Sequence, residues 1–331
     1  MPHAPSDPTS DVPVTFADVR EAVRRIAPHV HRTPVVTSAT IDVRVGTRVW
    51  FKCENLQKVG AFKARGAVNA VLSLGDEVAS RGVVTHSSGN HGQALAYAAA
   101  IRGIRCAVVM PDHAPRVKVD AVRGYGAEVV FCVHHERDRV AADLVAETGA
   151  AFVHPFDDPA VVAGQATVAA EFLDEVPDLD VLVAPIGGGG LLSGTVVAAA
   201  ALSPDTVVLG AEPAAVDDAA RSLASGVRQP AVTDPRTMAD GLLTRIGELP
   251  FRILSQAGVE IVTVTEAEIL EAATLFLERM KLVVEPSGAT GLAALLASPE
   301  RFAGKRVGIV LSGGNTDLAW YRPATTAPRN R

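Results

Sequence analysis

The chain has 331 residues with a formal net charge of −6, and 48% of its residues are hydrophobic, 21% charged and 5% aromatic. This length predicts two domains and excludes a small disulfide-stapled scaffold. The composition is typical of a globular protein and not of a disordered or collagen-like chain. With 31 Lys and Arg against 37 Asp and Glu, no basic surface for nucleic acid is expected.

The cysteine pattern and the N-terminal segment favour a cytoplasmic protein. Cys53, Cys106 and Cys132 are far apart and form no Cys-x-x-Cys pair, so they predict neither a disulfide framework nor a zinc site. Residues 1–13 lack the basic start and apolar run of a signal peptide, and we expect them to form a frayed tail. The longest apolar stretches, such as Val196–Leu202, are shorter than the ~20 residues of a membrane-spanning helix, so no membrane partner is expected.

Short β-branched runs alternate with helical patterns along the chain, separated by Gly, Pro and Asp. Thr15 and Asp18 form a capping box that opens the first helix. Its apolar face comprises Val19, Ala22, Val23 and Ile26. The elements expected after it are strand Val49–Cys53, helix Phe62–Leu74, strand Val83–Thr85, helix Asn90–Arg102, strand Cys106–Met110, helix Pro115–Tyr125, strand Glu128–Phe131, helix Glu136–Glu147, helix Ala160–Glu175, strand Val181–Pro185, helix Leu191–Leu202, strand Thr206–Ala211, helix Thr265–Lys281, helix Gly288–Leu296 and strand Val307–Leu311.

This alternation predicts the α/β fold class with doubly wound parallel sheets, because apolar strands joined by crossover helices are buried on both faces. In such sheets ligands bind beyond the carboxyl ends of the strands. Gly187–Gly190 stand at such a place, between an apolar strand and a helix. The run favours a phosphate site, with a flexible turn as the alternative. It matches neither GxGxxG nor GxxxxGK.

Three further segments carry polar groups at similar positions. Lys63 follows Phe62 and is bracketed by glycines, so it is a candidate amine with a lowered pKa, although a lone lysine is more often a solvated surface charge. The segment His86–Gln93 offers hydroxyl, amide and helix-start N–H groups that either bind a carboxylate or only cap a helix. Ser312 stands beside two glycines, in what by itself could be only a turn.

Together these segments resemble the fold type II pyridoxal-phosphate enzymes, in particular the serine racemase and serine/threonine dehydratase branch. The resemblance runs from Val14 to Asn315 and rests on FKCENLQKVGAFKARGAVNAV, VTHSSGNHGQALAYAA, HPFDDPAVVAGQ, GGGGLLSG, AEPAAVDD, ADGL, VVEPSGA and LSGGN. It implies two doubly wound α/β domains with a fold like the tryptophan synthase β-subunit. The large cofactor-binding domain would comprise residues 1–68 and 155–331, and the small substrate-closing domain residues 69–154. A homodimer formed through the large domain is also implied.

The resemblance assigns roles to residues around pyridoxal 5'-phosphate. Lys63 would form the Schiff base with its aldehyde, and Phe62 would support its ring. Asn90 would bond to the phenolic oxygen, Ser312 would face the pyridine nitrogen, and Glu285 would lie near the cofactor. The phosphate would be held by backbone amides of Gly187, Gly188, Gly189, Gly190 and Leu191.

The same resemblance implies how an amino-acid substrate reacts. The substrate-binding loop would comprise Ser87, Ser88, Gly89, Asn90 and His91. Freed Lys63 would remove the Cα proton, and the β-hydroxyl would leave with a proton supplied through the cofactor phosphate. A neutral hydroxyl at Ser312 favours prompt loss of this group over a long-lived carbanion. Ser88 occupies the family's position for the second acid–base group that racemisation needs.

A divalent cation is the second expected cofactor. Glu212, Asp218 and the carbonyl of Val216 match the cation site of this branch, and such oxygen ligands suit Mg²⁺ or Ca²⁺. An acidic, solvated loop is the alternative. The sequence departs from the family at Ala61, where a serine is common, and in the short segment around Arg137 and Asp138. Substrate choice and the racemase-to-dehydratase ratio therefore stay open.

The resulting hypothesis is a pyridoxal-phosphate-dependent dehydratase (ammonia-lyase). It would convert L-serine or L-threonine to a 2-oxo acid and ammonia, with serine racemisation as a further activity. Alternatives within the family are a 3-hydroxyaspartate dehydratase and an enzyme that is predominantly a racemase. A nicotinamide oxidoreductase would need a GxGxxG segment and a ribose-binding acid, which are not found. A catalytically silent protein that keeps the cofactor would be excluded by turnover.

Overall fold

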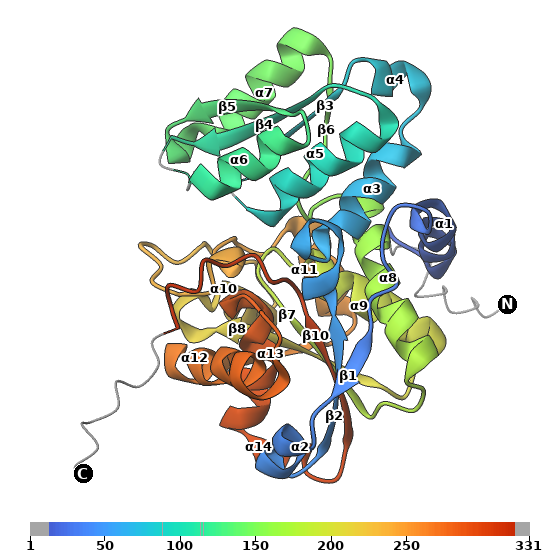
Figure 1. The fold of residues 1–331 in the computed structure, drawn as a ribbon. Helices are drawn as coiled ribbons and strands as arrows, with labels where there is room; N and C mark the ends of the chain where they lie inside the picture. Colours follow the sequence, from blue (N-terminus) through green and yellow to red (C-terminus); the bar gives the residue numbers. More distant parts are fainter. Residues whose placement is uncertain (1–12, 88, 113, 115, 322–331) are drawn as a thin grey trace, which may run out of the picture.

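The computed structural model describes residues 13–87, 89–112, 114 and 116–321. Its strands form a six-stranded sheet in the order β1-β2-β10-β7-β8-β9 and a four-stranded sheet in the order β5-β4-β3-β6. The two sheets lie in separate layered units, one above the other in Figure 1. Every pairing between named strands is parallel except β1 with β2, as expected for strands linked by crossover helices.

The smaller unit is built on the four-stranded sheet. Helices α5 and α6 lie on the face toward the larger unit, and α7 lies on the other face (Figure 1). The elements of this unit are α4 (Asp76–Ser80), β3 (Val83–His86), α5 (Asn90–Arg102), β4 (Cys106–Pro111), α6 (Arg116–Gly124), β5 (Glu128–Cys132), a 3₁₀ turn (His134–Glu136), α7 (Arg137–Thr148) and β6 (Ala151–Phe152).

The larger unit surrounds the six-stranded sheet and also contains the helices that join the two units. Its first elements are α1 (Phe16–Ile26), β1 (Val35–Thr37), α2 (Ala39–Val45), β2 (Arg48–Cys53), 3₁₀ turns η1 (Glu54–Leu56) and η2 (Lys58–Gly60), and α3 (Lys63–Ser73). After the smaller unit come α8 (Pro159–Glu175), β7 (Val181–Pro185), α9 (Gly190–Leu202), β8 (Val207–Pro213), η4 (Ala214–Val216), α10 (Asp218–Ser225), η5 (Asp240–Leu242), α11 (Glu248–Gln256), β9 (Glu260–Val264), α12 (Glu266–Leu275), α13 (Pro286–Ala297), α14 (Pro299–Phe302) and β10 (Arg306–Leu311).

Both faces of the six-stranded sheet are covered by apolar side chains. Successive residues of β10 point to opposite faces, so Ile309 packs into the core beneath α12 and α13 while Val310 packs into the core beneath α8 and α9. Both residues are fully buried. The sequence of β10 is therefore a continuous apolar run and not an alternating one, as a doubly covered parallel strand requires.

Most predicted elements are present, with local corrections. The capping box forms as predicted, because the Thr15 N–H donates to the Asp18 carboxylate at 2.8 Å. Val23 is 39% exposed, so it does not belong to the buried face of α1. The helix predicted to run to Lys281 leaves α-helical geometry at Phe276, where a π turn (Phe276–Met280) begins, and Lys281 itself has a positive φ of 60°. The prediction also missed the short elements β1, β6, α2, α4, α10, α11 and α14, and strand β9.

Candidate active site

A glycine cradle stands at the start of α9. Gly189 has a φ of 91°, and none of the described side chains caps this helix. A Cβ at Gly188 would lie 2.2 Å from the Phe156 ring, and one at Gly187 would lie 2.9 Å from the Cα of Leu242. Side chains therefore do not fit here, and the N–H groups of the first helical turn lack intrahelical partners. The cradle suits a small anion such as a phosphate group.

Lys63 is the first residue of α3, and its amine is buried. Its Nζ donates a hydrogen bond to the Pro155 carbonyl at 2.8 Å and lies 5.2 Å from the ring centre of Phe62 and 5.9 Å from that of Phe156. Burial lowers the pKa of this amine from 10.5 to about 8. A larger fraction of the amine is therefore neutral near pH 8 than for a surface lysine, which suits a nucleophile or a base.

Backbone pairing brings the Lys63 segment against the end of β10. The Phe62 N–H donates to the Ser312 carbonyl at 3.0 Å, and Ala61 forms an antiparallel bridge with Gly313. Ser312 is only 4% exposed. Its side-chain hydroxyl has no hydrogen-bond partner among the described residues, so it remains available to a bound group.

Asn90 is the first residue of α5 and is held by two polar neighbours. Its amide donates to the Glu285 carboxyl at 2.9 Å, and it accepts a hydrogen bond from Asn315 at 2.9 Å. Burial, with a smaller effect from Asp240, raises the pKa of Glu285 to about 8. Asn315 was not among the predicted site residues, although it ends the LSGGN motif.

The raised pKa of Glu285 predicts a pH dependence of stability. The pKa is higher in the folded chain than in the unfolded chain, so the folded state binds more protons and its stability falls between about pH 5 and about pH 8. We expect Glu285→Gln to reduce this fall by more than about 1 kcal/mol. Urea unfolding of the cofactor-free chain at the two pH values measures it, and an equal fall in the variant would contradict the assignment. Part of the fall should remain, because Glu212 shares the raised pKa.

The predicted substrate loop precedes α5. The Ser87 hydroxyl accepts a hydrogen bond from the Gly89 N–H at 3.2 Å. His91 is buried, with its Nε2 at 3.3 Å from the Val153 carbonyl, and burial lowers its pKa well below the ordinary value. A neutral His91 thus donates through Nε2, while its Nδ1 has no partner among the described atoms. Ser88 lies outside the described residues. The substrate roles of this loop stay predictions.

The predicted cation ligands lie between β8 and α10. The Glu212 carboxylate accepts hydrogen bonds from Ala219 and Ala220 N–H at 3.1 and 2.9 Å, and Asp218 accepts one from Ile246 N–H at 2.9 Å. Both carboxyl groups are buried, so the alternative of a solvated acidic loop is wrong. Burial raises the pKa of Glu212 to about 8. Within the described ranges, no three His, Cys, Asp or Glu side chains are arranged around a metal position.

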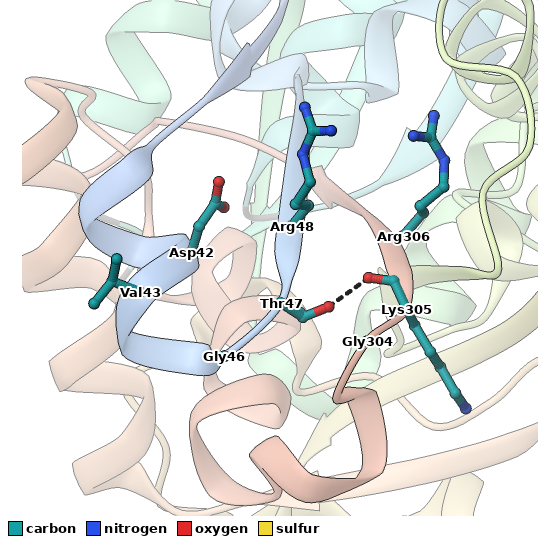
Figure 2. Close-up of a pocket in the computed structure, with 8 residues that line it drawn as sticks. All are labelled: Asp42, Val43, Gly46, Thr47, Arg48, Gly304, Lys305 and Arg306. Carbon is teal, nitrogen blue, oxygen red and sulfur yellow. Dashed lines mark hydrogen bonds between the residues drawn. The ribbon is translucent and has the colours of Figure 1, made fainter.

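A surface hollow of about 410 Å³ lies at the amino-terminal ends of strands β2 and β10. Arg48 and Arg306 begin the paired strands β2 and β10, and their side chains point the same way while Lys305 points away (Figure 2). Both guanidinium groups stack near Trp50, with distances of 5.1 and 4.6 Å to its ring centre. The predicted site residues follow the carboxyl ends of these strands, so this hollow is separate from the candidate site.

Comparisons with known proteins agree with this arrangement. Residues 26–313 match the family model of the pyridoxal-phosphate dependent enzymes. The chain belongs to this family. The resemblance predicted from the motifs, the α/β class and the pyridoxal phosphate requirement are therefore confirmed, and the chain is a pyridoxal-phosphate-dependent enzyme.

The family members most relevant to its activity are racemases and dehydratases. A serine racemase of Dictyostelium discoideum is 48% identical over 311 residues, which are 92% of this chain and 96% of the relative. A β-hydroxyaspartate dehydratase of Paracoccus denitrificans is 48% identical over 308 residues, 92% of this chain and 97% of the relative. The crystal structure of a threonine deaminase from T.th. superimposes with a TM-score of 0.88 at 46% identity, covering 93% of this chain and all of that one.

The cofactor fits the residues that the fold brings together. The glycine cradle suits its phosphate, the buried amine of Lys63 suits its aldehyde, and the buried hydroxyl of Ser312 suits its ring nitrogen. The sequence did not indicate the Pro155 carbonyl or the Phe156 ring as part of this site, although both stand in the motif HPFDDPAVVAGQ. None of the described helices is long and apolar enough to cross a membrane.

Proposed function

We propose that this enzyme is an ammonia-lyase for small β-hydroxy amino acids, L-serine and L-threonine first, with serine racemisation as a further activity. The observation that carries the proposal is the buried Lys63 amine, which lies 5.9 Å from the centre of the Phe156 ring against which the glycine cradle packs. The names of its relatives support the substrate class: serine racemase, β-hydroxyaspartate dehydratase and threonine deaminase. When bound, pyridoxal phosphate supplies an electron sink for negative charge at the substrate Cα.

Different residues of the chain would hold different parts of the cofactor. Lys63 Nζ would carry it covalently before the substrate enters, with Phe62 against its ring. Asn90 would bond to its phenolic oxygen, and the Glu285 carboxyl that Asn90 contacts would lie beside it. Ser312 would present a neutral hydroxyl to the ring nitrogen, so that the nitrogen stays largely unprotonated. The amides that would hold the phosphate are those of Gly187, Gly188, Gly189, Gly190 and Leu191.

The freed Lys63 amine would act as the base at the substrate Cα. The Lys63 Nζ donates to the Pro155 carbonyl, and no carboxylate contacts it in the described structure. The Pro155 carbonyl would therefore hold this amine between steps. The substrate carboxylate would lie at the start of α5, where the N–H groups of the first helical turn lack intrahelical partners. Ser88 would be the acid–base group on the opposite face, and residues 69–154 would close over the bound amino acid.

A 3-hydroxyaspartate dehydratase is the second candidate. Its support is the Paracoccus enzyme, which is as similar to this chain as the Dictyostelium racemase, at 48% identity. The purified enzyme should be given serine, threonine and both 3-hydroxyaspartate diastereomers, with 2-oxo acid, ammonia and chiral product measured. Fastest elimination from serine or threonine supports the first proposal. Fastest elimination from a hydroxyaspartate supports the second, and racemisation without ammonia release would contradict both.

A divalent cation is proposed at Glu212, Asp218 and the Val216 carbonyl. Two buried carboxyl groups with hard oxygen atoms suit Mg²⁺ or Ca²⁺, and a bound cation would offset their repulsion. We expect Mg²⁺ to raise the unfolding temperature by several degrees, about the effect of 1–3 kcal/mol, and a chelator to reverse it. Asp218→Asn should abolish the response, whereas Asp205→Asn, at an exposed position, should preserve it. Equal responses in both variants would place the cation elsewhere.

The assembly and the compartment are also proposed. The enzyme would form a homodimer through the larger unit, which sedimentation of the purified chain tests directly. A cytoplasmic location is supported by the cysteines, since Cys53, Cys106 and Cys132 are all buried and free. Free buried thiols are typical of reducing compartments.

A further inference from the structure

A buried ion cluster involves the first turn of α3, two residues after Lys63, and the proposed reaction gives the cluster no role. Its centre is Arg65, whose side chain is completely buried. The guanidinium donates two hydrogen bonds of 2.8 Å to the Glu54 carboxylate and two of 2.8 Å to the Glu171 carboxylate. Such a planar fork fits two carboxylates at once, which a lysine ammonium cannot do.

The remaining groups of the cluster are also paired. Arg65 donates further hydrogen bonds to the Thr167 hydroxyl and the His31 carbonyl, both at 3.2 Å. Lys52 Nζ lies 2.9 Å from Glu171, so two cations face two carboxylates. A buried ion cluster is weak evidence for stability, because desolvation offsets much of the attraction. Its defined geometry is the feature that needs an explanation.

The cluster fixes one helix against another. Arg65 lies on α3, whereas Thr167 and Glu171 lie on α8. The same helices touch closely, because a Cβ at Gly164 would lie only 2.6 Å from the Cα of Gly66. A small-residue contact of this kind leaves little freedom in the spacing of two helices. The hydrogen bonds of the Arg65 guanidinium to Thr167 and Glu171 add a directional constraint to that spacing. These contacts are called the Arg65 lock below.

The Arg65 lock affects the position of the Lys63 amine. Helix α3 begins at Lys63, and α8 begins at Pro159, four residues after Pro155. The hydrogen bond of 2.8 Å from Lys63 Nζ to the Pro155 carbonyl therefore joins the start of α3 to the segment that leads into α8, the two helices that Arg65 fixes. We infer that Arg65 is a positioning residue, which holds the Lys63 amine at the Pro155 carbonyl by fixing α3 on α8. This inference rests on the role proposed for Lys63.

A loosened lock would change the surroundings of Lys63 in a measurable way. Burial alone lowers the pKa of this amine. Its titratable neighbours are His91 and His154, whose own pKa values are lowered by burial, so both are neutral where Lys63 titrates. Water that enters between α3 and α8 would therefore move the pKa of Lys63 upward, toward its ordinary value.

The test uses two variants, Arg65→Lys and Glu171→Gln. The Glu171→Gln substitution nearly keeps the size of the side chain. Arg44→Lys is the control, because Arg44 forms an exposed ion pair with Glu271. The rate at which an acylating reagent modifies Lys63 is measured against pH in the full chain without cofactor, by mass spectrometry. We expect the midpoint to rise by about one pH unit in both test variants. After reloading with pyridoxal phosphate, kcat should fall about tenfold with little change in KM.

An unchanged midpoint in variants that merely unfold more easily would overturn the inference, since Arg65 would then act on stability alone. If Arg65→Lys does not fold, the midpoint of Glu171→Gln decides by the same criterion. A failure of the proposed function is separately visible. It would appear as visible cofactor absorbance that persists in Lys63→Ala, whatever the acylation midpoints of the Arg65 and Glu171 variants.

Discussion

Replacing Lys63 with alanine is expected to remove the visible absorbance that the enzyme shows with pyridoxal phosphate, and to lower kcat by more than about 10³-fold. The amine is the group that would both carry the cofactor and take the Cα proton. Stability should change little, because the buried amine has no carboxylate partner in the described structure and its hydrogen bond to Pro155 partly offsets its desolvation. Absorbance spectra, turnover and thermal unfolding measure the three effects.

Lys58→Ala is the matched control, since Lys58 lies five residues earlier, in the 3₁₀ turn η2, and is exposed. It should keep the visible band and nearly all activity. Retention of the band in Lys63→Ala would show that another lysine carries the cofactor. Loss of the fold in Lys63→Ala, seen by circular dichroism, would contradict the expectation of unchanged stability.

Gly188→Ala is expected to weaken cofactor binding by more than about tenfold and to lower the free energy of unfolding by about 1–3 kcal/mol. The new Cβ would lie 2.2 Å from the Phe156 ring. The Lys63 amine lies 5.9 Å from the centre of the same ring. Either the ring or the glycine cradle must move, and both alter the proposed phosphate site. A cofactor titration followed by absorbance, together with urea unfolding, measures the change.

The control for this substitution is Gly124→Ala, at the exposed end of α6, where an added Cβ meets no atom within 4 Å. It should leave cofactor affinity unchanged and slightly raise stability, as expected for alanine in a helix. An unaltered dissociation constant in Gly188→Ala would show that the cradle does not hold the phosphate.

Much of the fold was predictable because its determinants are local. The Thr15–Asp18 capping box needs residues only three positions apart, and helix Asn90–Arg102 forms over the predicted range. Strand β7 at Val181–Pro185 also has its predicted bounds, since an apolar β-branched run between turn residues specifies it. The short strands β1 and β6 were missed because two or three residues carry no periodicity.

For the site, the sequence by itself determined the residue types: a lysine at a helix start, four consecutive glycines at the start of α9, and a serine after β10. Motif order identified the family, which residues 26–313 confirm. The tertiary structure decided what surrounds these groups. Backbone pairing of Ala61 with Gly313 and of Phe62 with Ser312 brings Ser312 beside the Lys63 segment, and burial in the packed chain lowers the pKa of Lys63.

The same holds for groups without a sequence signal. The Pro155 carbonyl is a backbone atom, which no side-chain pattern reveals, and Arg65 reads as an ordinary helix charge until α8 places Glu171 against it. For Glu212 and Asp218, a solvated acidic loop stayed an alternative to a cation site until their burial was known. Local patterns depend on neighbours a few residues away, whereas desolvation and ion pairing depend on atoms that only the packed chain brings together.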